Sequence, residues 1–161
     1  MLNNTTNIPD QLVAHALAFI MEDEDMRDIE LPLRLTVKNK RHGKVHGQWG
    51  WYYSAERRIV LIVPRVIRKP FLVKRKYAPI ASYHCFSRSD FLVGVLAHEM
   101  RHCYQFQSWN TPRSSWRLKY DELGKIARET DAQLFEGKMI RLWQATISNL
   151  RKELMIETLT R

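Results

Sequence analysis

Residues 90–108 carry the pattern that most restricts the fold, because apolar and ligand-type side chains share one helical repeat. The apolar members recur at the spacing of a buried helix face: Phe91, Leu92, Val95, Leu96 and Met100. His98 and His102 lie one turn apart on this helix, where their imidazoles can reach one metal ion. Buried imidazoles need partners, so we favour a metal site over two ordinary core histidines.

Glu99 follows the first histidine and completes a His-Glu-x-x-His motif. Its place beside the ligand pair lets the carboxylate reach a water that the metal activates, rather than the metal itself. A general base requires this placement. We therefore expect Glu99 to be the catalytic residue of a zinc site.

A catalytic zinc usually takes three protein ligands, and no histidine follows His102, so the third ligand is an acid, an upstream histidine or absent. Glu129 lies on the next helical segment, and the small Ala132 on its face would let two helices approach closely. Asp131 is the rival, but two residues turn about 200° around a helix, so both are not expected to bind one ion. We favour Glu129 as the ligand and expect Asp131 to support the site or lie on the surface.

The remaining chain predicts an α+β fold. Helical patterns begin at Pro9-Asp10 and near Asp121, the second reaching Leu159 with Gly124, Gly137 and Ser148 as points where it could bend. Residues 1–8 are polar and expected to fray. Alternation of apolar and polar residues at every second position predicts strands over 31–38, 45–53 and 58–63, paired in meander order. A short strand is predicted over 71–73.

Three aromatic residues, Trp49, Trp51 and Tyr53, share one parity of the second predicted strand. A row of this kind could stack nucleic-acid bases. One face of a small sheet packing on helices accounts for it equally simply. We interpret the row as packing on helices.

Charge is spread unevenly along the chain. The segment Arg34–Lys76 holds thirteen Lys or Arg residues and one acid, Glu56, whereas Glu22–Glu30 holds six acids and one Arg. Such a basic surface could attract nucleic acid or another anionic partner, or could be solvated strand charge. Only two cysteines and no apolar N-terminal stretch favour a cytoplasmic setting, and the apolar runs are too short for a membrane partner to be expected.

Residues Leu96 to His102, together with Glu129-x-Asp131-Ala132, resemble the gluzincin-type zinc metallopeptidases, including the short intracellular ImmA/IrrE type of bacteria and phages. The resemblance implies one zincin-like domain over residues 1–161: a small, twisted, mostly antiparallel sheet packed on the metal-binding helix, with N-terminal and long C-terminal helices. It implies Zn²⁺ held by His98, His102 and Glu129. The basic, Trp-containing strands are also similar to SprT-like proteases, whose third histidine is missing here.

The expected function is therefore an intracellular zinc-dependent metallopeptidase that hydrolyses a protein or peptide substrate with Glu99 as general base. A further side chain could donate a hydrogen bond to the oxyanion that forms during peptide hydrolysis. The sequence does not rank the candidates, which are Tyr83, His84, Tyr104 and Tyr120. Two alternatives stay open. One is a basic nucleic-acid-binding protein with a structural zinc, contacting phosphates through Arg34–Lys76, and the other is a DNA-associated SprT-like protease.

Overall fold

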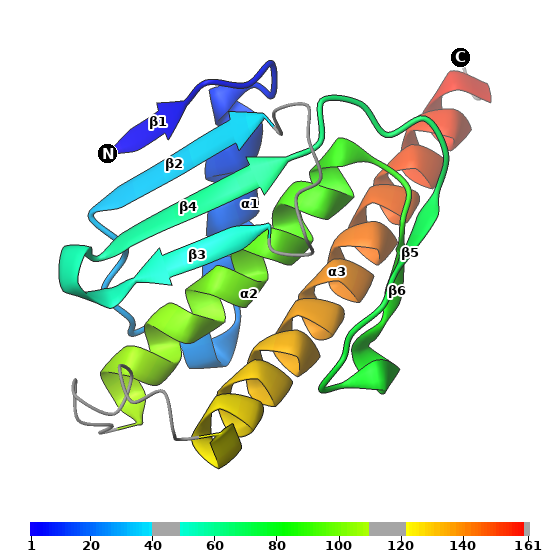
Figure 1. The fold of residues 1–161 in the computed structure, drawn as a ribbon. Coiled ribbons are helices and arrows are strands. Elements are labelled where there is room, and N and C mark those ends of the chain that lie inside the picture. The colour runs from blue at the N-terminus through cyan, green and yellow to red at the C-terminus, as the bar shows by residue number, and fades with distance from the viewer. Residues whose placement is uncertain (40–48, 110–121, 160–161) are drawn as a thin grey trace.

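The computed structural model describes residues 1–39, 49–109 and 122–159, with side chains described to residue 150. These residues form an α+β fold of three helices, a four-stranded mixed sheet and a two-stranded sheet (Figure 1). The elements in chain order are β1 (Leu2–Asn4), α1 (Asp10–Met21), η1 (Glu24–Met26), β2 (Arg34–Asn39), β3 (Gly50–Tyr53), η2 (Ser54–Glu56), β4 (Arg58–Val63), β5 (Phe71–Val73), η3 (Pro79–Ala81), β6 (Tyr83–Cys85), α2 (Arg88–Ser108) and α3 (Glu122–Leu159).

The main sheet has the order β1-β2-β4-β3, so the predicted meander is wrong. The short η2 turn, in which Arg57 adopts a left-handed conformation with φ of 44°, joins β3 and β4 as an antiparallel pair. β2 then pairs with the free side of β4 and runs parallel to it. The expectation of a mostly antiparallel sheet therefore also fails for this sheet, since two of its three strand pairs are parallel.

The N-terminus forms a strand instead of fraying. Residues 2–4 pair with β2 in parallel, and the Thr5 N–H continues the ladder by donating to the Val37 carbonyl at 2.9 Å. The reason is that β2 would otherwise end the sheet with unpaired backbone groups, and even a polar segment can satisfy them.

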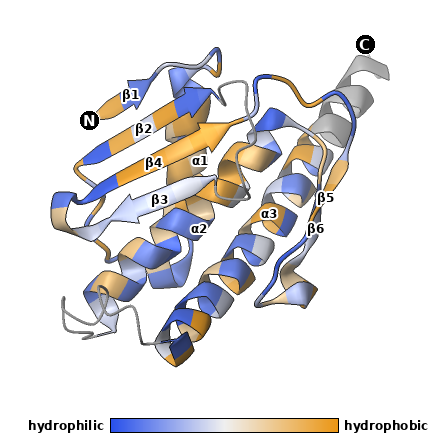
Figure 2. Cartoon of the chain, viewed as in Figure 1, coloured by the Kyte–Doolittle hydropathy of each residue, from blue (hydrophilic) through white to orange (hydrophobic). Residues whose placement is uncertain are grey.

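The core lies between the sheet and the helices α1 and α2, which cover one of its faces (Figure 1). The residues of β4 alternate, with Ile59, Leu61 and Val63 fully buried on the helix side. Figure 2 shows hydrophobic residues along most of this strand. The helix α2 begins at Arg88, two residues before the predicted helical pattern, because the Ser87 side chain caps it by accepting a hydrogen bond from the Asp90 N–H at 3.1 Å.

The interpretation of the aromatic row as helix packing is wrong for two of its members. In β3 the helix-facing residues are Gly50 and Tyr52, since they pair with Leu61 and Ile59 of β4. Trp51 and Tyr53 therefore point to the opposite face. Trp49, just outside the strand, does pack on α2, with its ring centroid 4.9 Å from that of Phe91.

The helix α3 packs along α2, and the β5–β6 hairpin with η3 covers it from the other side (Figure 1). The helix α3 is continuous through Gly124, Gly137 and Ser148, the positions where the sequence suggested that it could bend. Within the described residues, no helix combines the length and apolar character that a bilayer-spanning helix needs.

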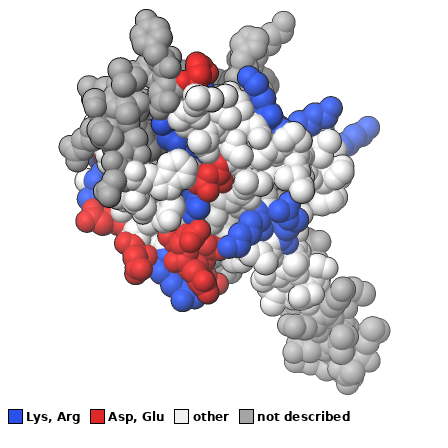
Figure 3. Space-filling view, turned by 90° about the horizontal axis from the view of Figure 1, so that it is seen from below, with Lys and Arg blue, Asp and Glu red and all other residues white. Residues whose placement is uncertain are grey.

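The acidic 22–30 segment follows α1 and contacts both long helices. Asp25 pairs with Arg101 of α2 at 2.8 Å, and Asp23 pairs with Lys138 of α3. Figure 3 shows acidic side chains gathered on one side of the molecule as seen from below. These pairs tie the acidic segment to both long helices.

Gly137 marks the closest contact between α3 and η3, and it gives the first prediction. A Cβ at this position would lie 2.8 Å from the Ala81 carbonyl oxygen and 3.0 Å from its Cα, so the backbones would have to separate. We expect Gly137→Ala to lower the free energy of unfolding by about 1–3 kcal/mol, measured by urea denaturation. The control is Ser148→Ala, an exposed position on the same helix, which should change that free energy by less than about 0.5 kcal/mol. Equal effects of the two substitutions would contradict the close contact.

Candidate metal centre

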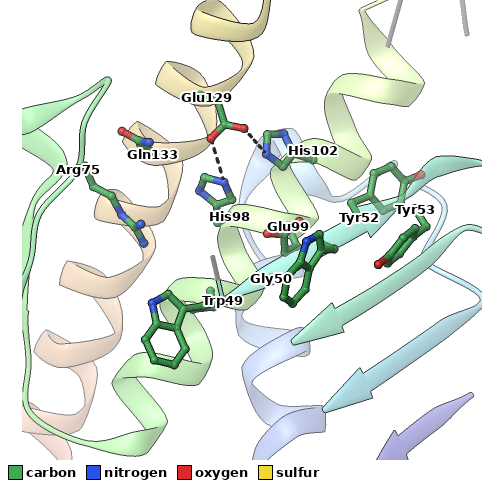
Figure 4. Close-up of a pocket in the computed structure, with 12 residues that line it drawn as sticks. Trp49, Gly50, Tyr52, Tyr53, Arg75, His98, Glu99, His102, Glu129 and Gln133 are labelled. Carbon is green, nitrogen blue, oxygen red and sulfur yellow. Dashed lines mark ion pairs between the residues drawn. The ribbon is translucent and has the colours of Figure 1, made fainter. Parts of the chain in front are cut away.

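Three side chains from two helices converge at one end of a cavity (Figure 4). His98 and His102 come from successive turns of α2, and Glu129 comes from α3. The two carboxylate oxygens of Glu129 lie 3.5 Å from Nε2 of His98 and 3.4 Å from Nε2 of His102. The ligand-type atoms of all three lie within 4.8 Å of one another, and among the described residues no other group of this kind was found.

A buried carboxylate orients the first histidine. Nδ1 of His98 lies 3.2 Å from Oε2 of Glu136, which is fully buried on α3. The other oxygen of Glu136 accepts a hydrogen bond from the Tyr83 hydroxyl at 2.7 Å and forms an ion pair with Arg75. Gly94 of α2, which has no Cβ, leaves the room that the Tyr83 hydroxyl occupies. Glu136 can accept the Nδ1–H of His98, and this arrangement would leave the Nε2 lone pair for a metal ion between His98 and Glu129.

The side-chain amide of Gln105 orients the second histidine, His102, through the same ring nitrogen, Nδ1. Nδ1 of His102 lies 2.8 Å from the Gln105 side-chain oxygen. The amide nitrogen of Gln105 donates to the Arg128 carbonyl at 2.9 Å and to Asp131 at 2.8 Å. Asp131 therefore supports the site from outside, as one of the two roles expected for it, and it is held in turn by Arg101 through bonds of 2.7 and 3.0 Å.

This donor set fits a catalytic metal site. Two imidazole nitrogens and one carboxylate are a common protein ligand set of catalytic zinc, and outer partners on the second ring nitrogen are the usual means of orienting them. Burial lowers the pKa of His98 to about 4, so its ring is neutral as a ligand must be. Burial alone would raise the pKa of Glu129, but hydrogen bonds from His102 and His98 outweigh it and hold that pKa well below its usual value.

Glu99 lies beside the histidines but outside their cluster. It is 5% exposed and lines a cavity of about 420 Å³ with the following residues: Trp49, Gly50, Trp51, Tyr52, Tyr53, Arg75, Val95, His98, His102, Glu129 and Gln133. Gly50 of β3 lies directly against it, because a Cβ there would come 2.5 Å from Oε1 of Glu99. Burial raises the pKa of Glu99 to about 7. The carboxylate is thus held between α2 and β3, with a pKa suited to proton transfer.

Arg75 is the one Lys or Arg among the described residues that line this cavity, and the sequence analysis missed it. None of the proposed oxyanion donors that the structure describes lines the cavity: Tyr83 is buried against Glu136, and Tyr104 and His84 lie elsewhere. Tyr120 lies outside the described residues. The segment before η3 has no periodic pattern, so nothing in the sequence placed Arg75 near the motif. Glu136 carried a usable signal, because it lies two helical turns beyond Glu129 on the same helix.

Comparison of the chain with protein-family models, with curated proteins and with solved structures finds no match. The function is therefore inferred from the geometry of the chain itself.

The Glu136 contact gives the second prediction. Glu136→Gln removes the charge that orients His98 and that pairs with Arg75, so we expect zinc affinity to fall by about 10–100-fold. Competition with a chromogenic chelator measures this affinity. The matched control is Glu122→Gln, which makes the same change at an exposed site on α3 and should leave the affinity unchanged. Wild-type affinity in the Glu136→Gln protein would show that the carboxylate does not support the metal site.

Proposed function

We propose that this protein is a zinc-dependent metallopeptidase in which His98, His102 and Glu129 hold the metal and Glu99 is the general base. The observation that carries the proposal is the division of roles within one cavity. Three ligand-type side chains converge, whereas Glu99 lines the same cavity without joining them. A purely structural zinc site is usually closed by four protein ligands. The described residues supply three.

The sheet arrangement supports a zincin-like peptidase. β3 is an edge strand, and its residues form one wall of the cavity above α2. An edge strand has unpaired backbone groups that can pair with an extended peptide. A peptide bound in this way would run along the cavity with its backbone near Glu99. The substrate class is accordingly a protein or peptide in extended conformation.

The chemistry follows from the residues in the cavity. A bound zinc supplies Lewis acidity, which lowers the pKa of a water towards about 7 and polarises a carbonyl. Glu99 accepts a proton from the attacking water and returns it to the departing amine. Arg75 places a fixed positive charge in the same cavity, where it can stabilise the oxyanion that forms when the carbonyl is attacked. Its ion pair with Glu136 holds it in position.

The two cysteines take no part in the site. Cys85 donates to the Ser87 carbonyl, Cys103 donates to the Glu30 carbonyl, and both are buried free thiols. Unpaired buried thiols suit a reducing compartment, so we place the proposed peptidase in the cytoplasm.

The third prediction tests Glu99 as the base. Glu99→Gln keeps the size of the side chain but removes its ability to accept a proton, so we expect peptide hydrolysis to fall by about 10²–10⁴-fold while bound zinc is retained. A mixed peptide library incubated with zinc-loaded protein and analysed by mass spectrometry measures the cleavage.

Wild-type protein treated with a chelator should lose cleavage and regain it on zinc addition. Full cleavage by the Glu99→Gln protein would contradict the assignment of the base. Absence of any cleavage by zinc-loaded wild type would contradict the peptidase proposal.

A further inference from the structure

The main sheet has a second face that no described helix or strand covers (Figure 1). The register of the ladders assigns its side chains, because residues paired across antiparallel or parallel strands lie on the same face. The open face carries Arg34, Thr36 and Lys38 from β2, Arg58, Val60 and Ile62 from β4, and Trp51 and Tyr53 from β3. An uncovered sheet face that carries apolar and aromatic side chains is a candidate binding surface.

The aromatic part of this face lies on the edge strand. Trp51 pairs with Val60 and Tyr53 pairs with Arg58 in the β3–β4 ladder. The Arg58 guanidinium lies 4.4 Å from the centre of the Tyr53 ring, and Tyr53 is 39% exposed. Aromatic rings and an arginine plane side by side on a sheet are the elements on which nucleic-acid bases stack.

The cationic part lies on the opposite side of the face, over β1 and β2. A hollow of about 260 Å³ is lined by Arg34, Lys38 and Arg58, with Met1, Asn3 and Thr36 completing its wall. No acid lines it. Glu56 is the only acid between residues 31 and 89, and it pairs with Arg58 at 2.9 Å. Arg34 and Lys38 are exposed, so the hollow keeps a net positive charge that suits phosphate.

We propose that the open face, hereafter the sheet platform, binds single-stranded nucleic acid. Phosphates occupy the hollow beside Arg34 and Lys38, and bases stack on Trp51 and Tyr53. The two parts are separated by two strand spacings, about 10 Å, so the backbone and the bases of one strand lie side by side on the platform. Trp51 and Tyr53 also border the metal cavity, because β3 forms its wall, whereas the cationic hollow shares no lining residue with that cavity. Binding to the platform does not depend on the proposed peptidase activity.

Other anionic partners fit this surface less well. A duplex keeps its bases stacked inside, so it would use the cations and leave Trp51 and Tyr53 without a role. An anionic membrane would be met by protruding apolar side chains, whereas Val60 and Ile62 lie partly buried between longer neighbours. The pairing of open rings with a cationic hollow favours a single strand.

The fourth prediction tests the sheet platform with labelled DNA and RNA single strands of about 16 nucleotides, read by fluorescence anisotropy. We expect binding at low salt. Trp51→Ala and Tyr53→Ala should each weaken it roughly tenfold or more, as loss of one stacked base predicts. Arg34→Glu and Lys38→Glu should each weaken it and reduce the slope of log affinity against log salt by about 0.7 for each lost phosphate contact.

Matched controls lie outside the platform. Lys74→Glu makes the same charge change within the basic segment but at the end of β5, and Phe86→Ala removes an exposed aromatic ring after β6. Both should bind like wild type. Zinc content of the Arg34→Glu and Lys38→Glu proteins should stay at the wild-type value, which shows that they fold.

Three results would overturn the proposal. They are no binding of either single strand at low salt, binding that is unaffected by the Trp51 and Tyr53 substitutions, or a duplex bound as tightly as the single strand.

Discussion

The structure depends on burying two imidazoles and a carboxylate at one point between two helices. His98 and His102 can face Glu129 only if their other ring nitrogens are satisfied, because an unpaired buried polar group costs about as much as a lost hydrogen bond. Glu136 and Gln105 supply those partners. Their own requirements then fix the surroundings, since Glu136 needs a cation and a donor that the hairpin side of α3 provides.

β3 connects this buried centre with the outer surface. On its helix side Gly50 allows the backbone to approach Glu99, which completes the cavity. On its opposite side, Trp51 and Tyr53 project onto the sheet platform. Both proposed activities therefore use the same edge strand, one through its backbone and one through its side chains. The parallel pairing of β2 with β4 makes this possible, because it leaves β3 at the edge.

Local patterns predicted the helices and the convergent side chains well. The spacing of His98 and His102, and a carboxylate at Glu129 on the following helix, were enough because helical geometry fixes which residues share a face. The sheet was predicted less well. Strand alternation shows which residues face the same way, but not which face meets the helices, so the positions of Trp51 and Tyr53 were wrong. Arg75 depends on tertiary packing of an irregular segment, which no local pattern encodes.

Zinc stoichiometry of the wild-type, His102→Ala and Glu129→Ala proteins tests the central claim most directly. Three ligands predict about one zinc per wild-type chain and loss of that zinc in both variants, measured by atomic emission on dialysed protein. A Glu129→Ala protein that keeps its zinc while His102→Ala loses it would contradict Glu129 as a ligand. A wild-type chain that takes up no zinc on reconstitution would contradict the metal centre itself.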